Sequence, residues 1–89
     1  MPEKVPLKTR LEILAMMREA AITEEYTMEV GLKVKRRFMI TMPANIDMEF
    51  RTKMQAQVSK EEHQLEQQQK VVGIIEEMIA DQERSAAKT

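Results

Sequence analysis

The sequence has no cysteine and a single histidine among its 89 residues. Without cysteine the chain can form neither a disulfide framework nor a thiolate zinc site, and one histidine argues against a histidine-based metal centre. Aromatic residues make up 3% of the chain and tryptophan is absent, whereas methionine occurs nine times. We therefore expect no bound metal or cofactor, and a core of adaptable aliphatic and thioether side chains.

Glycine and proline are also scarce, with two and three residues respectively. Two isolated glycines cannot build a phosphate-binding loop or the Gly-x-Ser-x-Gly elbow of a hydrolase. No apolar run approaches the roughly 20 residues that cross a bilayer, and the polar start Met1–Lys4 does not resemble a signal peptide. These absences predict a cytoplasmic protein that is not an enzyme and does not bind membranes.

Charge of the two signs is nearly balanced, with 14 basic and 15 acidic residues and a net charge of −1. The chain therefore lacks the positive footprint of a general nucleic-acid binder. Residues 1–58 carry ten basic and eight acidic side chains, a charge of +2, and residues 59–89 carry four and seven, a charge of −3. This mild asymmetry favours antiparallel self-association only weakly.

Few helix breakers and apolar residues spaced three or four apart predict an all-α protein. The expected helices cover about residues 7–20, 23–38 and 45–58, and a further helix begins at residue 59. Thr23, Asn45 and Ser59 have the side chains of N-cap residues, although one continuous helix through Ser59 is an open alternative. Met39–Ala44 is interpreted as a loop against the core, in which Pro43 favours an extended conformation of the preceding residue.

Each expected helix has an apolar face that an antiparallel neighbour can cover. The predicted faces are Leu7/Leu11/Leu14/Met17, Tyr26/Val30/Val34/Phe38, Ile46/Phe50/Met54/Val58 and Leu65/Val72/Ile75/Ile79. Three to five helices in antiparallel pairs then form a small helical bundle, a single domain over residues 1–89 with six N-terminal and about eight C-terminal residues frayed. A chain this short is marginal alone, so the broad apolar end of the last helix predicts a homodimer.

The densest positive cluster is a candidate contact for an anion or an acidic partner. It consists of Lys33, Lys35, Arg36 and Arg37. The cluster lacks an interleaved aromatic residue for base stacking, and cations also suit the carbonyl end of a helix without any ligand. The structural interpretation is therefore favoured over nucleic-acid binding.

His63 is the side chain whose ordinary pKa lies closest to neutrality, and it is the candidate for proton transfer or phosphoryl acceptance. The Glu-x-x-His spacing of helix-bundle metal sites would require glutamate at position 60, where Lys60 stands. Since polar and charged residues surround it, a solvated histidine is the favoured interpretation.

The stretch from Arg10 to Lys60 resembles the short stand-alone PTS regulation domains of bacterial sugar-uptake systems. The segments that carry the resemblance are Leu11–Leu14, Arg18–Glu25, Val30–Val34 and Asn45–Met54. In this family the last segment corresponds to a helix with a phosphorylatable histidine, and Lys53 occupies that position here. The resemblance implies a dimerising regulatory module controlled by association, with no phosphoacceptor at Lys53 and none assigned to His63.

The leading hypothesis is thus a non-catalytic regulatory or protein-interaction module, linked through the resemblance to transcription regulation in sugar-phosphotransferase systems. Its partners would be a second copy and a protein of the sugar-uptake system. One alternative is a small helical chaperone or adaptor that binds an amphipathic helix of a partner in a methionine-rich groove. A second alternative is weak nucleic-acid or anion binding through the basic end of the helix at residues 23–38.

Overall fold

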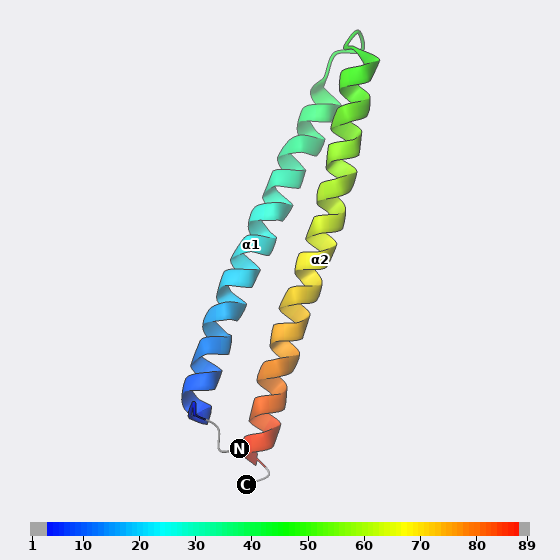
Figure 1. Ribbon diagram of the computed structural model, residues 1–89. Coiled ribbons are helices and arrows are strands. Elements are labelled where there is room, and N and C mark those ends of the chain that lie inside the picture. Colours follow the sequence, from blue (N-terminus) through cyan, green and yellow to red (C-terminus); the bar gives the residue numbers. More distant parts are fainter. Residues whose placement is uncertain (1–3, 88–89) are drawn as a thin grey trace.

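The computed structural model describes residues 4–87, which fold into two long helices joined by a short loop (Figure 1). Helix α1 spans Leu7–Thr41 and helix α2 spans Met48–Ala87. The helices lie side by side and antiparallel, so the two termini share one end of the hairpin and the loop forms the other (Figure 1). The molecule measures 67 × 19 × 18 Å with a radius of gyration of 20.0 Å. A compact domain of this length would have a radius of about 12 Å.

The all-α prediction is confirmed, but the predicted number of three to five helices is wrong, because the described residues form two. The predicted breaks at Thr23 and Ser59 do not occur, and both residues lie inside continuous helices. The Thr23 hydroxyl donates a hydrogen bond to the Glu19 carbonyl at 2.9 Å instead of capping a new helix. Threonine can bond the carbonyl four residues back, so a cap-forming side chain alone does not end a helix.

Pro43 lies in the connection between the helices, where its missing N–H and its effect on the preceding residue oppose helix. Met42 is extended, with φ −63° and ψ 136°, as the sequence predicts. Helix α2 begins three residues later than expected, since the carboxylate of Asp47, rather than Asn45, accepts a hydrogen bond from the Glu49 N–H at 3.1 Å. Pro43 also accepts a hydrogen bond from the Ile46 N–H at 3.2 Å, which closes the turn.

The buried and half-buried residues of both helices follow the alternating spacing of three and four that is typical of a coiled coil. In α1 this seam comprises Leu7, Leu11, Leu14, Ala21, Glu25, Met28, Leu32, Lys35 and Met39, and Arg18 is exposed at its seam position. In α2 it comprises Arg51, Met54, Val58, Glu61, Leu65, Gln68, Val72, Ile75, Ile79, Gln82 and Ala86. The hairpin is therefore an antiparallel two-helix coiled coil.

Ala21 packs with Val72 and Ile75 in an apolar cluster of the seam, and Ile79 lies against them; Leu14, Leu32 and Val58 are buried elsewhere along the seam. Polar residues lie between these apolar positions. Gln68 donates a side-chain hydrogen bond to the Ala21 carbonyl at 3.0 Å, and Lys35 pairs with Glu61. Polar seam residues reduce stability but restrict the register in which two helices can pair.

Some of the predicted apolar faces are buried in the seam, and others are exposed to solvent. The face at Leu65/Val72/Ile75/Ile79 lies in the seam as expected, and so do Leu14 and Val58 from two other faces. The face at Tyr26/Val30/Val34/Phe38 is wrong, because these side chains are 65%, 40%, 61% and 50% exposed. Met17 and Phe50, also assigned to the core, are 50% and 44% exposed. A strict spacing of four runs about 40° ahead of each helical turn, so such a stripe drifts off the seam.

The predicted fraying of the chain ends falls partly on residues 1–3 and 88–89, which lie outside the described residues. Within the described range α2 remains helical to Ala87. The methionines are divided between two environments. Met28, Met39, Met42 and Met54 are half-buried, whereas Met16, Met17, Met48 and Met78 are exposed. The thioether side chains thus serve both the seam and the surface.

Candidate interaction surface

The predicted basic cluster lies inside α1, which continues to Thr41. Lys35 and Arg36 reach across to α2, where Lys35 pairs with Glu61 and Arg36 lies 2.8 Å from a carboxylate oxygen of Glu62. Consecutive helical residues point about 100° apart, so the four basic side chains do not share one surface. Two of them are engaged by acidic partners, and an anion contact by Lys33 and Arg37 stays a prediction.

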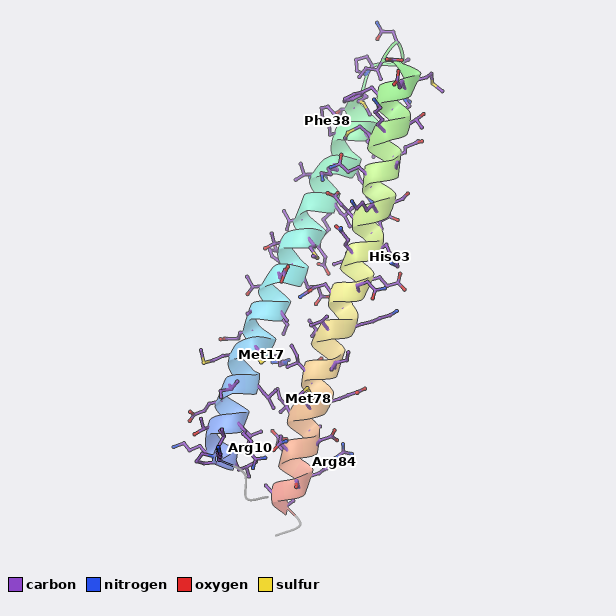
Figure 2. The ribbon with its side chains drawn as sticks, viewed as in Figure 1. Arg10, Met17, Phe38, His63, Met78 and Arg84 are labelled. Carbon is purple, nitrogen blue, oxygen red and sulfur yellow. The ribbon has the colours of Figure 1, made fainter. Side chains whose placement is uncertain are left out.

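His63 is exposed on α2 (Figure 2), and Lys53 is exposed on the same helix. Lys53 forms an ion pair with Glu49, one turn earlier, at 3.3 Å. Within the described residues, no three histidine or acidic side chains come together in a way that could hold a metal ion. The structure therefore does not join these two sequence-predicted residues into one site.

One side of the hairpin carries large apolar side chains next to the seam on both helices. We call this side the open face. Its terminal patch consists of Ile13, Met17, Val71, Ile74 and Met78, which are 47%, 50%, 43%, 56% and 47% exposed. Its loop patch consists of Val34, Phe38 and Phe50, which are 61%, 50% and 44% exposed. Met17 and Met78 are seen on neighbouring helices at the terminal end (Figure 2).

Two surface depressions show that the two helices contribute to the open face together. Near the termini, Ile13 of α1 and Met78 of α2 line one depression. At mid-length, Gly31 and Gln64 line another. In an antiparallel coiled coil the positions that flank the seam on one side face each other, which agrees with both pairs. The open face is thus continuous over the hairpin, with an apolar patch at each end and a polar middle.

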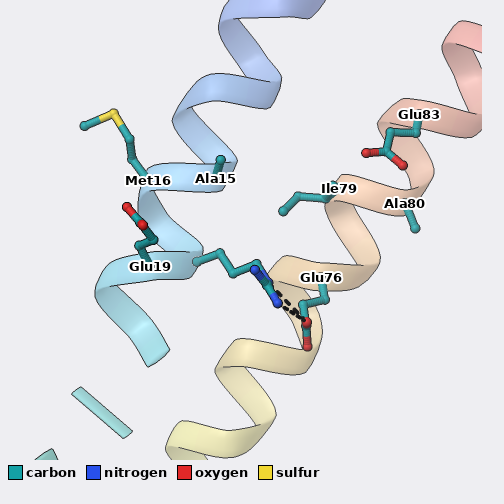
Figure 3. A pocket seen from close by; sticks show the side chains of 8 residues that line it. Ala15, Met16, Glu19, Glu76, Ile79, Ala80 and Glu83 are labelled. Carbon is teal, nitrogen blue, oxygen red and sulfur yellow. Dashed lines mark hydrogen bonds and ion pairs between the residues drawn. The ribbon is translucent and has the colours of Figure 1, made fainter. Parts of the chain in front are cut away.

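The opposite side of the seam, the paired face, has a different character. Arg18 and Glu76 form an ion pair across it at 3.1 Å (Figure 3). Arg36 and Glu62 form a second ion pair farther toward the loop. A depression beside the first pair is lined by Ala15 and Ala80 and by charged side chains, together with Met16 and Ile79. Of the two sides, the open face is the one with large apolar surface at both ends.

Charge is distributed unevenly along the length of the hairpin. The loop half, residues 28–65, has seven basic and five acidic residues, a net charge of +2, and its outer part, residues 33–60, carries +5. The terminal half, residues 4–27 and 66–87, has six basic and nine acidic residues, a net charge of −3. Because both termini lie at one end, the loop half of the hairpin is positive and the terminal half is negative (Figure 1).

Only one part of the open face was expected from the sequence, namely the broad apolar end of the last helix, which includes Val71, Ile74 and Met78. The sequence shows the other apolar residues of this face, but it led us to assign four of them to the core: Met17, Val34, Phe38 and Phe50. The available signal was the register of the seam, which polar residues such as Glu25 and Lys35 obscure. Once the seam is known, the remaining apolar side chains fall on one flank of it.

Comparison with protein-family models, with curated proteins and with solved structures finds no match to this chain. The resemblance to PTS regulation domains is therefore neither supported nor opposed by these comparisons. Among the described residues, neither helix is sufficiently long and apolar to cross a membrane.

Proposed function

We propose that this chain is a non-catalytic protein-interaction module that acts through helix–helix association, with the open face as its docking surface. The observation that carries the proposal is the asymmetry between the two sides of the seam. Eight large apolar side chains are exposed on the open face, whereas ion pairs cross the paired face at two levels. Exposed apolar patches of this kind are typical of protein interfaces.

The energetics favour covering the open face. Removing apolar surface from water stabilises an assembly by about 25 cal/mol per Å². Side chains such as Ile74 and Phe38 are already held on rigid helices, so a partner helix would order few additional backbone groups. The hairpin therefore offers a preorganised surface to another helix.

A regulatory role in the cytoplasm, with a link to sugar-phosphotransferase control, is the finer form of this proposal and rests on the family resemblance. In that form the module acts by association alone, because Lys53 stands at the family's histidine position. Incubation with a phosphorylated histidine phosphocarrier is expected to leave both Lys53 and His63 unlabelled, as detected by mass spectrometry under alkaline conditions. Stable phosphate on His63 would contradict control by association alone.

The proposal is tested by photo-crosslinking in the cells from which the chain comes. A photoreactive phenylalanine analogue at Ile74 is expected to form a covalent adduct with a protein, because Ile74 lies on the open face and is 56% exposed. The same analogue at Glu66, which is exposed on another side of α2, is the matched control and is expected to form little or no adduct.

The position dependence of crosslinking decides the result. Equal adduct formation at Ile74 and Glu66, or no adduct at Ile74, would show that the open face is not a docking surface. Adducts confined to Ile74 support the proposal, whatever the partner.

A further inference from the structure

We propose that the open face docks against the open face of a second copy of this chain, in an antiparallel arrangement that forms a four-helix bundle. In this dimer the loop end of each hairpin lies over the terminal end of the other. The inference rests on the proposed function, because it names the partner of the same surface. Three independent features of the hairpin support it.

The first feature is the position of the two apolar patches. The terminal patch and the loop patch lie on either side of a polar middle and are separated along α1 by about 20 residues, or roughly 30 Å. A twofold axis placed between two facing hairpins, across their length at the middle of the open face, brings the α1 part of each terminal patch onto the α1 part of a loop patch. On α2 it brings Val71 and Met78 onto Lys60 and Lys53 of the other copy, whose aliphatic stems can cover apolar surface. Met17 of one copy then lies next to Phe38 of the other.

The second feature is the polar middle itself. The open face there is formed by Thr27, Gly31 and Gln64, which line one depression. A side chain added at Gly31 would meet nothing within 4 Å, so the surface is low at this point and permits a close approach. Near the axis Gln64 of one copy lies opposite Gln67 of the other, and amide side chains can both donate to and accept from each other.

The third feature is charge, which selects the antiparallel arrangement over the parallel one. A parallel pair would also superimpose apolar patches, but it would place the loop half at +2 over another loop half at +2, with the +5 segments at residues 33–60 facing each other. The antiparallel pair places a loop half at +2 over a terminal half at −3 at both ends. Each helix in the antiparallel bundle also has antiparallel neighbours, so that opposite ends of the helix dipoles are adjacent.

The inference is tested by charge substitutions whose effects depend on orientation. Sedimentation equilibrium of the unmodified chain is expected to give twice the 10.4 kDa of a single chain. Met17→Glu alone, or Phe38→Lys alone, buries an unpaired charge twice per dimer and is expected to weaken the dimer on the order of 100-fold. The double variant M17E/F38K is expected to restore dimerisation, because each glutamate meets a lysine of the other copy.

The rescue cannot arise within one chain or in a parallel dimer. Met17 and Phe38 of one copy are about 30 Å apart along α1, and in a parallel pair they do not meet across the axis. Ala80→Glu, on the paired face beside Glu76, is the control and is expected to leave the dissociation constant within a factor of three. Circular dichroism at 222 nm on each variant checks that the helices are intact. We expect no loss of helix, because the Met17 and Phe38 side chains are half exposed in the hairpin.

A second measurement reports orientation directly. The chain has no cysteine, so Ala44→Cys places one spin label at the tip of the loop. Double electron–electron resonance measures the distance between the spin labels of the two copies. Because each hairpin is 67 Å long, we expect this distance to exceed about 50 Å in the antiparallel dimer and to be within about 30 Å in a parallel one.

The outcomes separate this inference from the proposed function. A monomer at high micromolar concentration, a short distance between the two loop labels, or absence of rescue in M17E/F38K would each overturn the antiparallel dimer. In any of these cases, adducts from Ile74 to a different protein would still uphold the open face as a docking surface. Absence of any adduct from Ile74 would remove the proposed function as well.

Discussion

Replacing Leu32 by alanine is expected to lower the free energy of unfolding by about 3 kcal/mol. Leu32 is the most deeply buried large side chain of the described residues, at 2% exposure. Its loss removes apolar contacts and opens a cavity in a seam that is only one layer thick. Urea unfolding followed by circular dichroism at 222 nm, at one fixed chain concentration, measures the change. A downward shift of the melting temperature on the order of 15 °C should accompany it.

Ile40→Ala is the matched control for Leu32→Ala. It removes the same number of carbon atoms from the same helix, but Ile40 is 82% exposed and lies off the seam. Because alanine has the higher helix propensity, this change is expected to be neutral or slightly stabilising. Similar losses from the two substitutions would show that Leu32 is not buried between the helices.

The second large effect is expected at the ion pair between Lys35 and Glu61. Their side chains are 31% and 27% exposed, and the second carboxylate oxygen of Glu61 is buried with no hydrogen-bond partner within the described residues. Lys35→Met alone is expected to lower the free energy of unfolding by about 2 kcal/mol, because it leaves the Glu61 carboxylate at the seam without its cation. The free energy of unfolding of the double variant K35M/E61L is expected to exceed that of the unmodified chain by about 1 kcal/mol, since apolar side chains avoid the desolvation of two charges.

A double-mutant cycle from urea unfolding measures this coupling. The exposed pair Arg36–Glu62, with side chains 51% and 47% exposed, provides the comparison. Removing both charges with R36Q/E62Q is expected to change stability by less than about 0.5 kcal/mol, because water screens exposed ion pairs. If K35M/E61L proves less stable than the unmodified chain, the pair contributes net stability and our account of the polar seam is wrong.

The local features of the fold were accessible from the sequence to different degrees. The all-helical class follows from the scarcity of breakers, and the extended conformation at Met42 follows from the proline after it. The start of α2 was misplaced because both Asn45 and Asp47 can cap a helix. The breaks predicted at Thr23 and Ser59 failed because a side chain that can cap a helix is also tolerated inside one.

The candidate surface was harder to predict than the helices. Tyr26, Val30, Val34 and Phe38 form a convincing stripe at a spacing of four, but the seam of a supercoiled pair alternates three and four. Seven seam positions carry polar residues that interrupt the pattern. They are Arg18, Glu25, Lys35, Arg51, Glu61, Gln68 and Gln82. Which apolar residues are buried could therefore be decided only by the pairing of the two helices.

The sequence by itself determined that the chain is helical, that Pro43 lies in a break between helices, and that residues 33–60 are rich in positive charge. These properties depend on backbone preferences and on neighbours along the chain. The tertiary structure decided that two helices form rather than the three to five predicted, that they meet along a partly polar seam, and that the eight apolar side chains of the open face are left exposed beside it. Burial is a property of contacts between distant segments, so it became defined only when α2 folded back along α1.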